Sequence, residues 1–335
     1  MKRLSILSLA FLALWACGSK QDIAPAATAS HRGVYHWKTT FNPTAWEKQW
    51  MKDHKVDRLY VKLFEVESGE NAGKREWKMV PVATTSFPQK LPADMEVIPV
   101  VYITVDAIRT LDADYWSSDA ETYAKLIVDR IDDMMSEHYG DSVREVQLDC
   151  DWTPQTEHAY FTLAKEIKNR LKGRGVLLSG TLRLHQLREV EHPTQGSWGR
   201  GDSLPFDRSM LMCYNTGRLQ DPATRNSILD FADAEPYLKQ YKSRFLPRTD
   251  VAFPVYGWGL EFDKNGAFRR IVNPYRLPEE KSGNLREEWG EPGQIRKVRQ
   301  ALPALDSLHT IVLYHLDSLN LSRYSHEDIE EFYSR

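Results

Sequence analysis

The chain has 335 residues, with 44 basic and 47 acidic side chains and a formal net charge of −3 at pH 7. It contains no cluster of Lys and Arg and no basic helix face, which argues against nucleic acid as a partner because phosphate neutralisation dominates that kind of binding. Aromatic residues make up 11% of the chain and ten of them are Trp, a supply that suits either a large core or the stacking of sugar rings.

The N-terminus has the pattern of an export signal. Lys2 and Arg3 precede an uncharged apolar run over 4–15, and Ala16 and Cys17 follow. This run is too short for a membrane-spanning helix, which needs about 20 apolar residues. A cysteine at the cleavage position predicts a signal peptide over 1–16 and lipidation of Cys17; a plain signal peptide cleaved further on is the alternative.

We therefore expect an exported lipoprotein of the bacterial cell envelope, facing the periplasm or the outside, that touches the membrane only through its lipid anchor. The small and polar residues of 17–31 predict a flexible tether, and 32–335 is left as one folded domain. Loss of Lys2 and Arg3 with the signal makes the net charge of the mature protein −5.

Strand-like runs alternate with helical or loop-rich stretches in the remaining chain, a pattern typical of parallel α/β folds. Their number favours a (β/α)₈ barrel of the TIM type over an open sheet. The runs are Gly33–Trp37, Arg58–Val66, Glu96–Thr104, Glu145–Trp152, Val176–Leu184, Ser209–Asn215, Asp250–Trp258 and Thr310–Asp317.

Three helices have clear boundaries. Apolar residues recur at helical spacing between Thr156, a predicted cap, and Gly173, a predicted stop. A second helix is predicted over Asp119–His138, and the last begins at a Ser325–Asp328 capping box. An insertion over 261–292 follows the seventh strand, and its Asn265-Gly266 pair predicts a hairpin turn.

The fourth strand carries the most informative motif, Gln147-Leu148-Asp149-Cys150-Asp151-Trp152-Thr153. Side chains alternate along a strand, so the apolar set should face the helices and the polar set the barrel interior. Asp149 is then deep, and Asp151 and Thr153 lie near the C-terminal rim, where barrels of this type keep their active sites. Cys150 shares the outward parity with Cys213 on the sixth strand, so we expect both cysteines to be free and buried, with a disulfide as the alternative.

Two aspartates this close in a confined site need a compensating cation. The parity of the second strand points Lys62 inward, and the fifth strand offers Arg183. We therefore expect a buried network of Asp149, Asp151, Lys62 and Arg183, which serves either acid–base chemistry or only the filling of the barrel by structural ion pairs.

The motif resembles Asp-X-Asp-X-Glu on the fourth strand of the chitinase-like glycoside hydrolases of family eighteen. Other runs are similar to motifs of the same family: Met212-Cys213-Tyr214-Asn215 to Met-X-Tyr-Asp on the sixth strand, and Pro254-Val255-Tyr256-Gly257 to Pro-X-Tyr-Gly on the seventh. Tyr314 takes the place of a tryptophan on the eighth strand. An even closer resemblance is to uncharacterised bacterial barrels with Gln-X-Asp-X-Asp on strand four.

The resemblance implies a glycoside hydrolase whose partner is an oligosaccharide or polysaccharide, with no cofactor. However, Thr153 stands where the family has its acid Glu, and a hydroxyl cannot replace a carboxylic acid as proton donor at neutral pH. Asn215 likewise replaces an aspartate. Two hypotheses stay open: hydrolysis with relocated carboxylates, which we favour at this point, or a glycan-binding lipoprotein that has lost its acid.

For hydrolysis we assign Asp151 as the central carboxylate, Asp149 as its neighbour and Glu65 as the second of the pair, although Glu65 has the wrong parity unless the strand ends there. Further acidic candidates are Glu67, Glu157 and Asp317. We expect the substrate to contact Tyr35, Trp37, Lys62, Arg183, Tyr214, Asn215, Tyr256, Trp258 and Tyr314.

Other chemistries lack support in the sequence. His36, His185, His192 and His315 have no metal-ligand spacing, so no metal site is predicted. Ser179-Gly180 lacks the leading glycine of a nucleophile elbow, and the chain has no glycine loop for phosphate.

Overall fold

The computed structural model describes residues 31–71, 76–111, 116–191, 204–239, 248–273, 275, 284–302 and 310–334. The predicted signal peptide over 1–16, the predicted lipidation site Cys17 and the tether up to residue 30 lie outside the described residues. In the part of the chain that is described, no helix has both the length and the apolar character needed to cross a membrane.

Eight parallel strands of the described chain form a closed barrel, which confirms the predicted fold class. Each strand pairs in parallel with its neighbour in the order β1-β12-β8-β7-β6-β5-β4-β2, and pairing of β1 with β2 closes the ring. The strands are β1 (His31–His36), β2 (Arg58–Asn71), β4 (Glu96–Ile103), β5 (Glu145–Asp149), β6 (Leu177–Arg183), β7 (Arg208–Met212), β8 (Arg248–Pro254) and β12 (Thr310–Tyr314).

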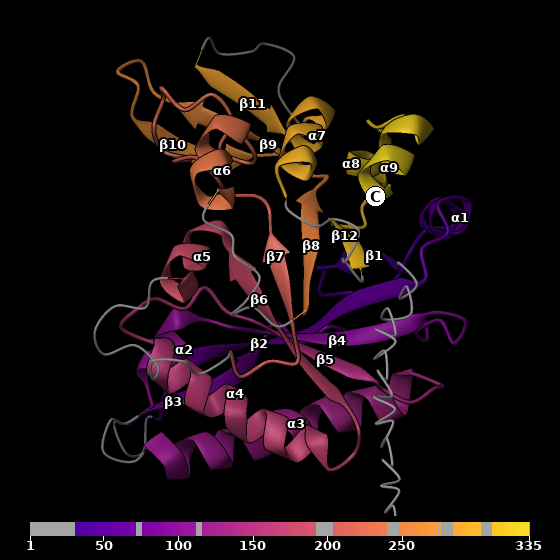
Figure 1. The fold of residues 1–335 in the computed structure, drawn as a ribbon, viewed down its shortest axis with the longest axis vertical. Helices are drawn as coiled ribbons and strands as arrows, with labels where there is room; N and C mark the ends of the chain where they lie inside the picture. Colours follow the sequence, from indigo (N-terminus) through magenta and orange to yellow (C-terminus); the bar gives the residue numbers. More distant parts are fainter. Residues whose placement is uncertain are drawn as a thin grey trace, which may run out of the picture.

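Most crossovers between barrel strands contain helices, which cover the outside of the barrel (Figure 1). They are α1 (Ala45–Asp53), α2 (Val105–Arg109), α3 (Trp116–His138), α4 (Glu157–Lys172), α5 (Leu184–Glu191), α6 (Phe231–Leu238) and α7 (Pro292–Ala301), with α8 (Ser318–Leu321) and α9 (His326–Tyr333) after the last strand.

The predicted helix boundaries are close to the observed ones. Helix α4 ends at Gly173 as expected, and Thr156 precedes its first residue, but the Thr156 side chain makes no cap hydrogen bond. Helix α9 has the predicted capping box, in which the side chains of Ser325 and Asp328 each accept a bond from the other's backbone N–H. A second capping box, between Thr44 and Glu47, begins α1.

One connection differs from the prediction. The second barrel strand continues beyond Val66 to Asn71, and the chain returns as β3 (Glu76–Val82), which pairs with β2 antiparallel. The connection is therefore a hairpin and not the expected helical or loop-rich crossover. Residues 67–71 and 76–82 form backbone hydrogen bonds with each other.

The insertion after the seventh barrel strand is a small antiparallel sheet at the same end of the molecule as α6 and α7 (Figure 1). It consists of β9 (Gly257–Phe262), β10 (Phe268–Val272) and β11 (Leu285–Trp289), with β9 in the centre. The predicted hairpin turn joins β9 to β10, with Gly266 at φ +83, a conformation that favours glycine.

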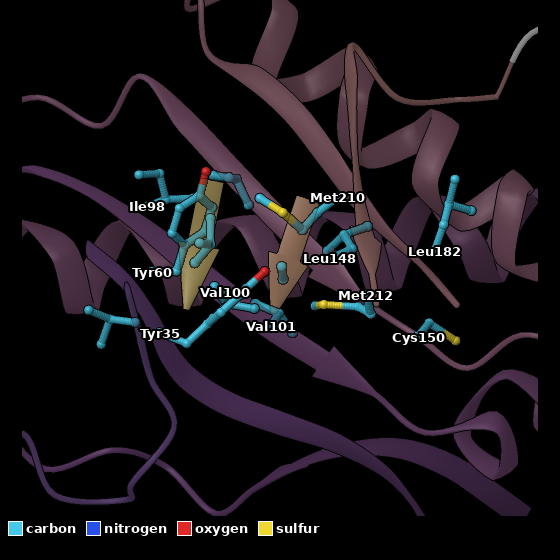
Figure 2. Close-up of a cluster of buried hydrophobic side chains, with 14 of the residues drawn as sticks. Tyr35, Tyr60, Ile98, Val100, Val101, Leu148, Cys150, Leu182, Met210 and Met212 are labelled. Carbon is cyan, nitrogen blue, oxygen red and sulfur yellow. The ribbon is translucent and has the colours of Figure 1, made fainter. Parts of the chain in front are cut away.

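Apolar side chains fill the layer between strands and helices as the parity of the fourth strand predicted. Cys150 and Trp152 are fully buried, and the Trp152 ring meets Phe161 of α4 edge-on at 5.2 Å. Cys150 and Cys213 are free and buried, which confirms that expectation. Figure 2 shows Leu148, Cys150 and Leu182 in this core together with residues of the other strands.

Charged side chains close the N-terminal end of the barrel. Arg58 lies 2.8 Å from Glu96 and 3.6 Å from the buried Glu145, which is 3.7 Å from Arg208. Burial raises the pKa of the nearby Asp250 to about 6.

Candidate functional site

A cavity of about 500 Å³ opens at the C-terminal end of the barrel. Every barrel strand, or the residues directly after it, contributes to the lining, so this is the mouth at which barrels of this class carry their sites. The lining residues are Trp37, Glu65, Tyr102, Asp149, Arg183, Tyr214, Asn215, Tyr256, Trp258, Tyr314 and His315.

Arg183 links the two aspartates of the strand-four motif. Its Nε donates to Oδ1 of Asp151, and its Nη2 lies 3.8 Å from Oδ1 of Asp149. Asp149 is 3% exposed and also accepts a hydrogen bond of 2.5 Å from the Thr181 hydroxyl, whereas the Asp151 side chain is 42% exposed. The depth order predicted from strand parity, Asp149 below Asp151, is thus observed.

The buried position of Asp149 affects its protonation. Burial raises the pKa of this carboxyl above its ordinary value, and the charge of Asp151 acts in the same direction, while Arg183 and the Thr181 hydroxyl oppose them. Asp149 therefore holds a proton more readily than an ordinary aspartate does. Burial also raises the pKa of Tyr102, in the same cavity, to about 12.

A β-bulge brings Glu65 into the cavity. One extra residue, Leu63, separates the pairs Lys62–Val100 and Phe64–Val101 in the ladder between β2 and β4. An extra residue reverses the alternation of side chains along a strand, so Lys62 and Glu65 lie on the same face. Lys62 is 3% exposed, and its ammonium forms an ion pair with Glu65 and lies 5.5 Å from the centre of the Trp37 ring.

In place of the expected four-membered network, the structure has two separate groups of ion pairs. Arg183 forms ion pairs with Asp149 and Asp151, and Lys62 forms one with Glu65. Lys62 faces the barrel interior, as the strand parity predicted. It does not line the cavity, and its ammonium is paired with the Glu65 carboxylate.

Aromatic rings form one wall of the cavity. The Tyr314 ring lies 5.4 Å from Tyr214, 5.6 Å from Tyr256 and 5.5 Å from Trp37, measured between ring centres. Trp258 extends this wall, 5.3 Å from Tyr256. The rings are tilted or edge-on to one another, so the cluster gives an aromatic surface with several ring orientations next to the charged residues of the cavity.

Two side chains fix the orientation of that wall. The Tyr256 hydroxyl donates a hydrogen bond of 2.9 Å to Oδ1 of Asn215, whose backbone has a φ of +58. The Trp258 indole N–H donates one of 2.8 Å to Glu288 on β11, which is 2% exposed and also accepts from Ser227 and Arg286. No local sequence pattern marks Glu288, because its role depends on the fold of the insertion.

Several sequence-predicted residues lie elsewhere. Tyr35 is fully buried below the cavity, where its hydroxyl donates to Gln147 at 2.5 Å. Thr153 does not line the cavity and shares hydrogen bonds with Thr156 at the start of α4. Among the further acidic candidates, Glu67 is an exposed member of the β2–β3 ladder, Glu157 is buried in α4, and Asp317 caps α8 and pairs with Lys38.

Asp151 lies in a second cavity of about 240 Å³ that shares Arg183, Tyr214 and Asn215 with the first. The two cavities are neighbours across the Arg183 side chain. Together they offer a longer binding surface than the first cavity alone.

The described residues bring three potential metal ligands together at one place, His54, His326 and Glu330. None of these lines the mouth. Within the described chain, the mouth is a site of aromatic rings and ion pairs, with a buried carboxyl, Asp149, whose pKa is raised.

Comparison of the fold with solved structures finds chitinase-type barrels. The chitinase of Chromobacterium violaceum has a TM-score of 0.54 at 12% identity, over 92% of this chain and 100% of that one. A GH18 chitinase of Cycas revoluta in complex with (GlcNAc)4 has a TM-score of 0.52 at 12% identity, over 90% and 98%. The spore cortex-lytic enzyme SleL of Bacillus cereus has a TM-score of 0.50 at 14% identity, over 89% and 75%.

Neither family models nor curated proteins give a match to the sequence. At such low identity the structural similarity concerns the fold alone. The chain has the (β/α)₈ barrel that GH18 glycoside hydrolases also have.

Proposed function

We propose that the protein binds a glycan in the mouth of its barrel. The observation that carries the proposal is the joining of an aromatic wall to a charged floor in one open cavity of about 500 Å³. Sugar rings have apolar faces that pack on aromatic side chains and hydroxyls that bond to carboxylates and guanidinium groups. The volume is also in the range of ordinary small-ligand sites, about 300–1,000 Å³.

The adjoining cavity supports an oligosaccharide over a single sugar. A chain lying across Arg183 would place one unit against the aromatic wall and extend toward Asp151 and Tyr237. The Cycas revoluta chitinase with a similar fold was solved with (GlcNAc)4. We accordingly propose a glycan with N-acetylglucosamine units as the first ligand to test.

Hydrolysis is the second candidate, and the ion pairs make it the less favoured one. Asp151 and Glu65 each face a cation directly, which neutralises the charge that a base or nucleophile would use. Thr153, at the position of the family's acid, is occupied with Thr156. Asp149 leaves hydrolysis as a candidate, because burial shifts its pKa upward, which is the direction that a general acid needs.

Incubation with a panel of bacterial and chitin-derived glycans separates these functions. The wild type, Asp149→Asn and the exposed control Asp106→Asn would be compared by thermal midpoint and by release of sugar. A rise in midpoint without products supports binding. Products that disappear only in Asp149→Asn support hydrolysis, and no effect of any glycan on midpoint or products refutes both.

We further propose that Cys17 anchors the protein to the envelope membrane through lipid. The short apolar run before Cys17 and the small polar residues after it support this proposal. In cell fractionation, the wild type and a Ser19→Ala control should sediment with membranes. Cys17→Ala should lose incorporated fatty acid, and equal acylation of this variant would refute lipidation at that residue.

A further inference from the structure

A second candidate site lies outside the mouth. The imidazole nitrogens of His54 and His326 and a carboxylate oxygen of Glu330 all lie within 4.8 Å of one another. His54 directly follows the last residue of α1, and His326 and Glu330 are one turn apart on α9. The cluster therefore joins two helices that are almost at opposite ends of the described chain.

Its geometry is close to that of a metal-binding set. Nδ1 of His54 lies 3.1 Å from Oε1 of Glu330, and two ligand atoms on one tetrahedral zinc are about 3.3 Å apart. Residues at i and i+4 of a helix lie on the same face, so the backbone of α9 already directs His326 and Glu330 to one side. The His54 and His326 rings are 4.7 Å apart between centres.

We propose that His54, His326 and Glu330 bind a divalent transition metal of the zinc class. Two imidazoles and one carboxylate are a ligand set that zinc accepts, with a fourth position left for water. Magnesium and calcium prefer sets made of oxygen atoms, so they should bind here poorly. Sequence spacing could not reveal this set, since His54 is far from α9 along the chain.

Arg32 supports the site from outside the ligand set. Its Nη1 donates to both carboxylate oxygens of Glu330, at 2.9 and 3.0 Å, and to the backbone carbonyl of His54 at 2.9 Å. These bonds hold two of the three ligands in place, as groups around a metal's ligands commonly do. The guanidinium charge also repels the metal, so we expect a moderate affinity.

Metal binding here would link α9 to the residue that follows α1. Helix α9 already contacts the first strand through the Tyr333 hydroxyl, which donates to the carbonyl of Gly33 at 2.8 Å. A metal held by both α1 and α9 adds a cross-link between the same regions that is absent from the unfolded chain. The site therefore links two regions that are far apart in the sequence, and the mouth lies apart from it.

The test uses purified protein without a histidine tag, freed of metal by a chelator. Zinc at 100 times its Kd should raise the ratio of folded to unfolded protein about 100-fold, seen as a higher thermal midpoint. Cobalt should give the visible absorption of a tetrahedral site. The exposed His326→Ala should lose both effects, whereas the exposed control His158→Ala should keep them.

Glu330→Gln is a second ligand variant, which tests the proposal independently if His326→Ala folds poorly. Glu330→Gln keeps an oxygen for Arg32 but removes the charge that holds the metal, so zinc should stabilise it at least tenfold less. The proposal is overturned if zinc leaves the wild-type midpoint unchanged, if magnesium acts as strongly as zinc, or if both ligand variants respond like the wild type.

Discussion

Replacing Arg183 by methionine removes the cation that faces both aspartates of the mouth while keeping an unbranched apolar stem. Asp149, only 3% exposed, would then keep the hydrogen bond from the Thr181 hydroxyl but would face no cation. Removal of one partner of a buried ion pair typically costs about 3–5 kcal/mol. We expect about 3 kcal/mol, because the Arg183–Asp149 separation is 3.8 Å and Asp151 is exposed enough to be hydrated.

The loss should depend on pH in a definite direction. The folded-state pKa of Asp149 is raised, so this carboxyl contributes stability below about pH 4 that is lost as the pH rises through its folded pKa. Arg183 opposes that rise, and its removal shifts the pKa further upward. The cost of Arg183→Met should therefore be small near pH 4 and reach its full value near pH 7.

Urea unfolding followed by circular dichroism at both pH values measures this cost. A loss of about 3 kcal/mol corresponds to roughly 6 °C in thermal midpoint for a domain of this size. The control Arg174→Met removes a partly exposed pair with Asp132 and should cost about 1 kcal/mol or less at either pH. Equal costs of Arg183→Met at both pH values, or an equal cost in an Asp149→Asn background, would refute the reasoning.

Three further outcomes are expected. Gly180→Ala should cost about 1–3 kcal/mol in urea unfolding, since an added Cβ would lie 2.5 Å from an aromatic ring, whereas Gly173→Ala has open space and should cost much less. Asp250, with its pKa raised to about 6, contributes stability that is lost as the pH rises from about 4 past 6, and Asp250→Asn should flatten this part of the unfolding profile. Glu288→Ala leaves the Trp258 indole without its acceptor and should cost about 2–3 kcal/mol and shift the tryptophan emission; unchanged emission would contradict its positioning role.

The barrel and the depth of its aspartates could be predicted because both depend on local alternation. Each of the eight strand-like runs became a barrel strand, and the parity of the fourth strand placed Trp152 outward and Asp149 inward. Such patterns are set by burial on the two faces of one strand. Free, buried Cys150 and Cys213 followed from the same argument.

The remaining features depend on contacts between distant segments. The bulge at Leu63 reverses the parity of β2 and brings Glu65 into the cavity, and nothing in the local pattern marks that extra residue. The β2–β3 hairpin was missed because its second strand, Glu76–Val82, was not recognised as a strand. Glu288 gains its role only when the insertion folds beside Trp258.

Calorimetric titration with chitin oligosaccharides tests most directly whether the barrel mouth binds a glycan. Trp258 lines the cavity, and Trp46 is a 43% exposed tryptophan on α1 that serves as the matched control. We predict saturable binding that Trp258→Ala weakens about tenfold or more, a loss of about 1.4 kcal/mol, while Trp46→Ala leaves the affinity unchanged. Equal affinity in the wild type and both variants would contradict a glycan site in the mouth.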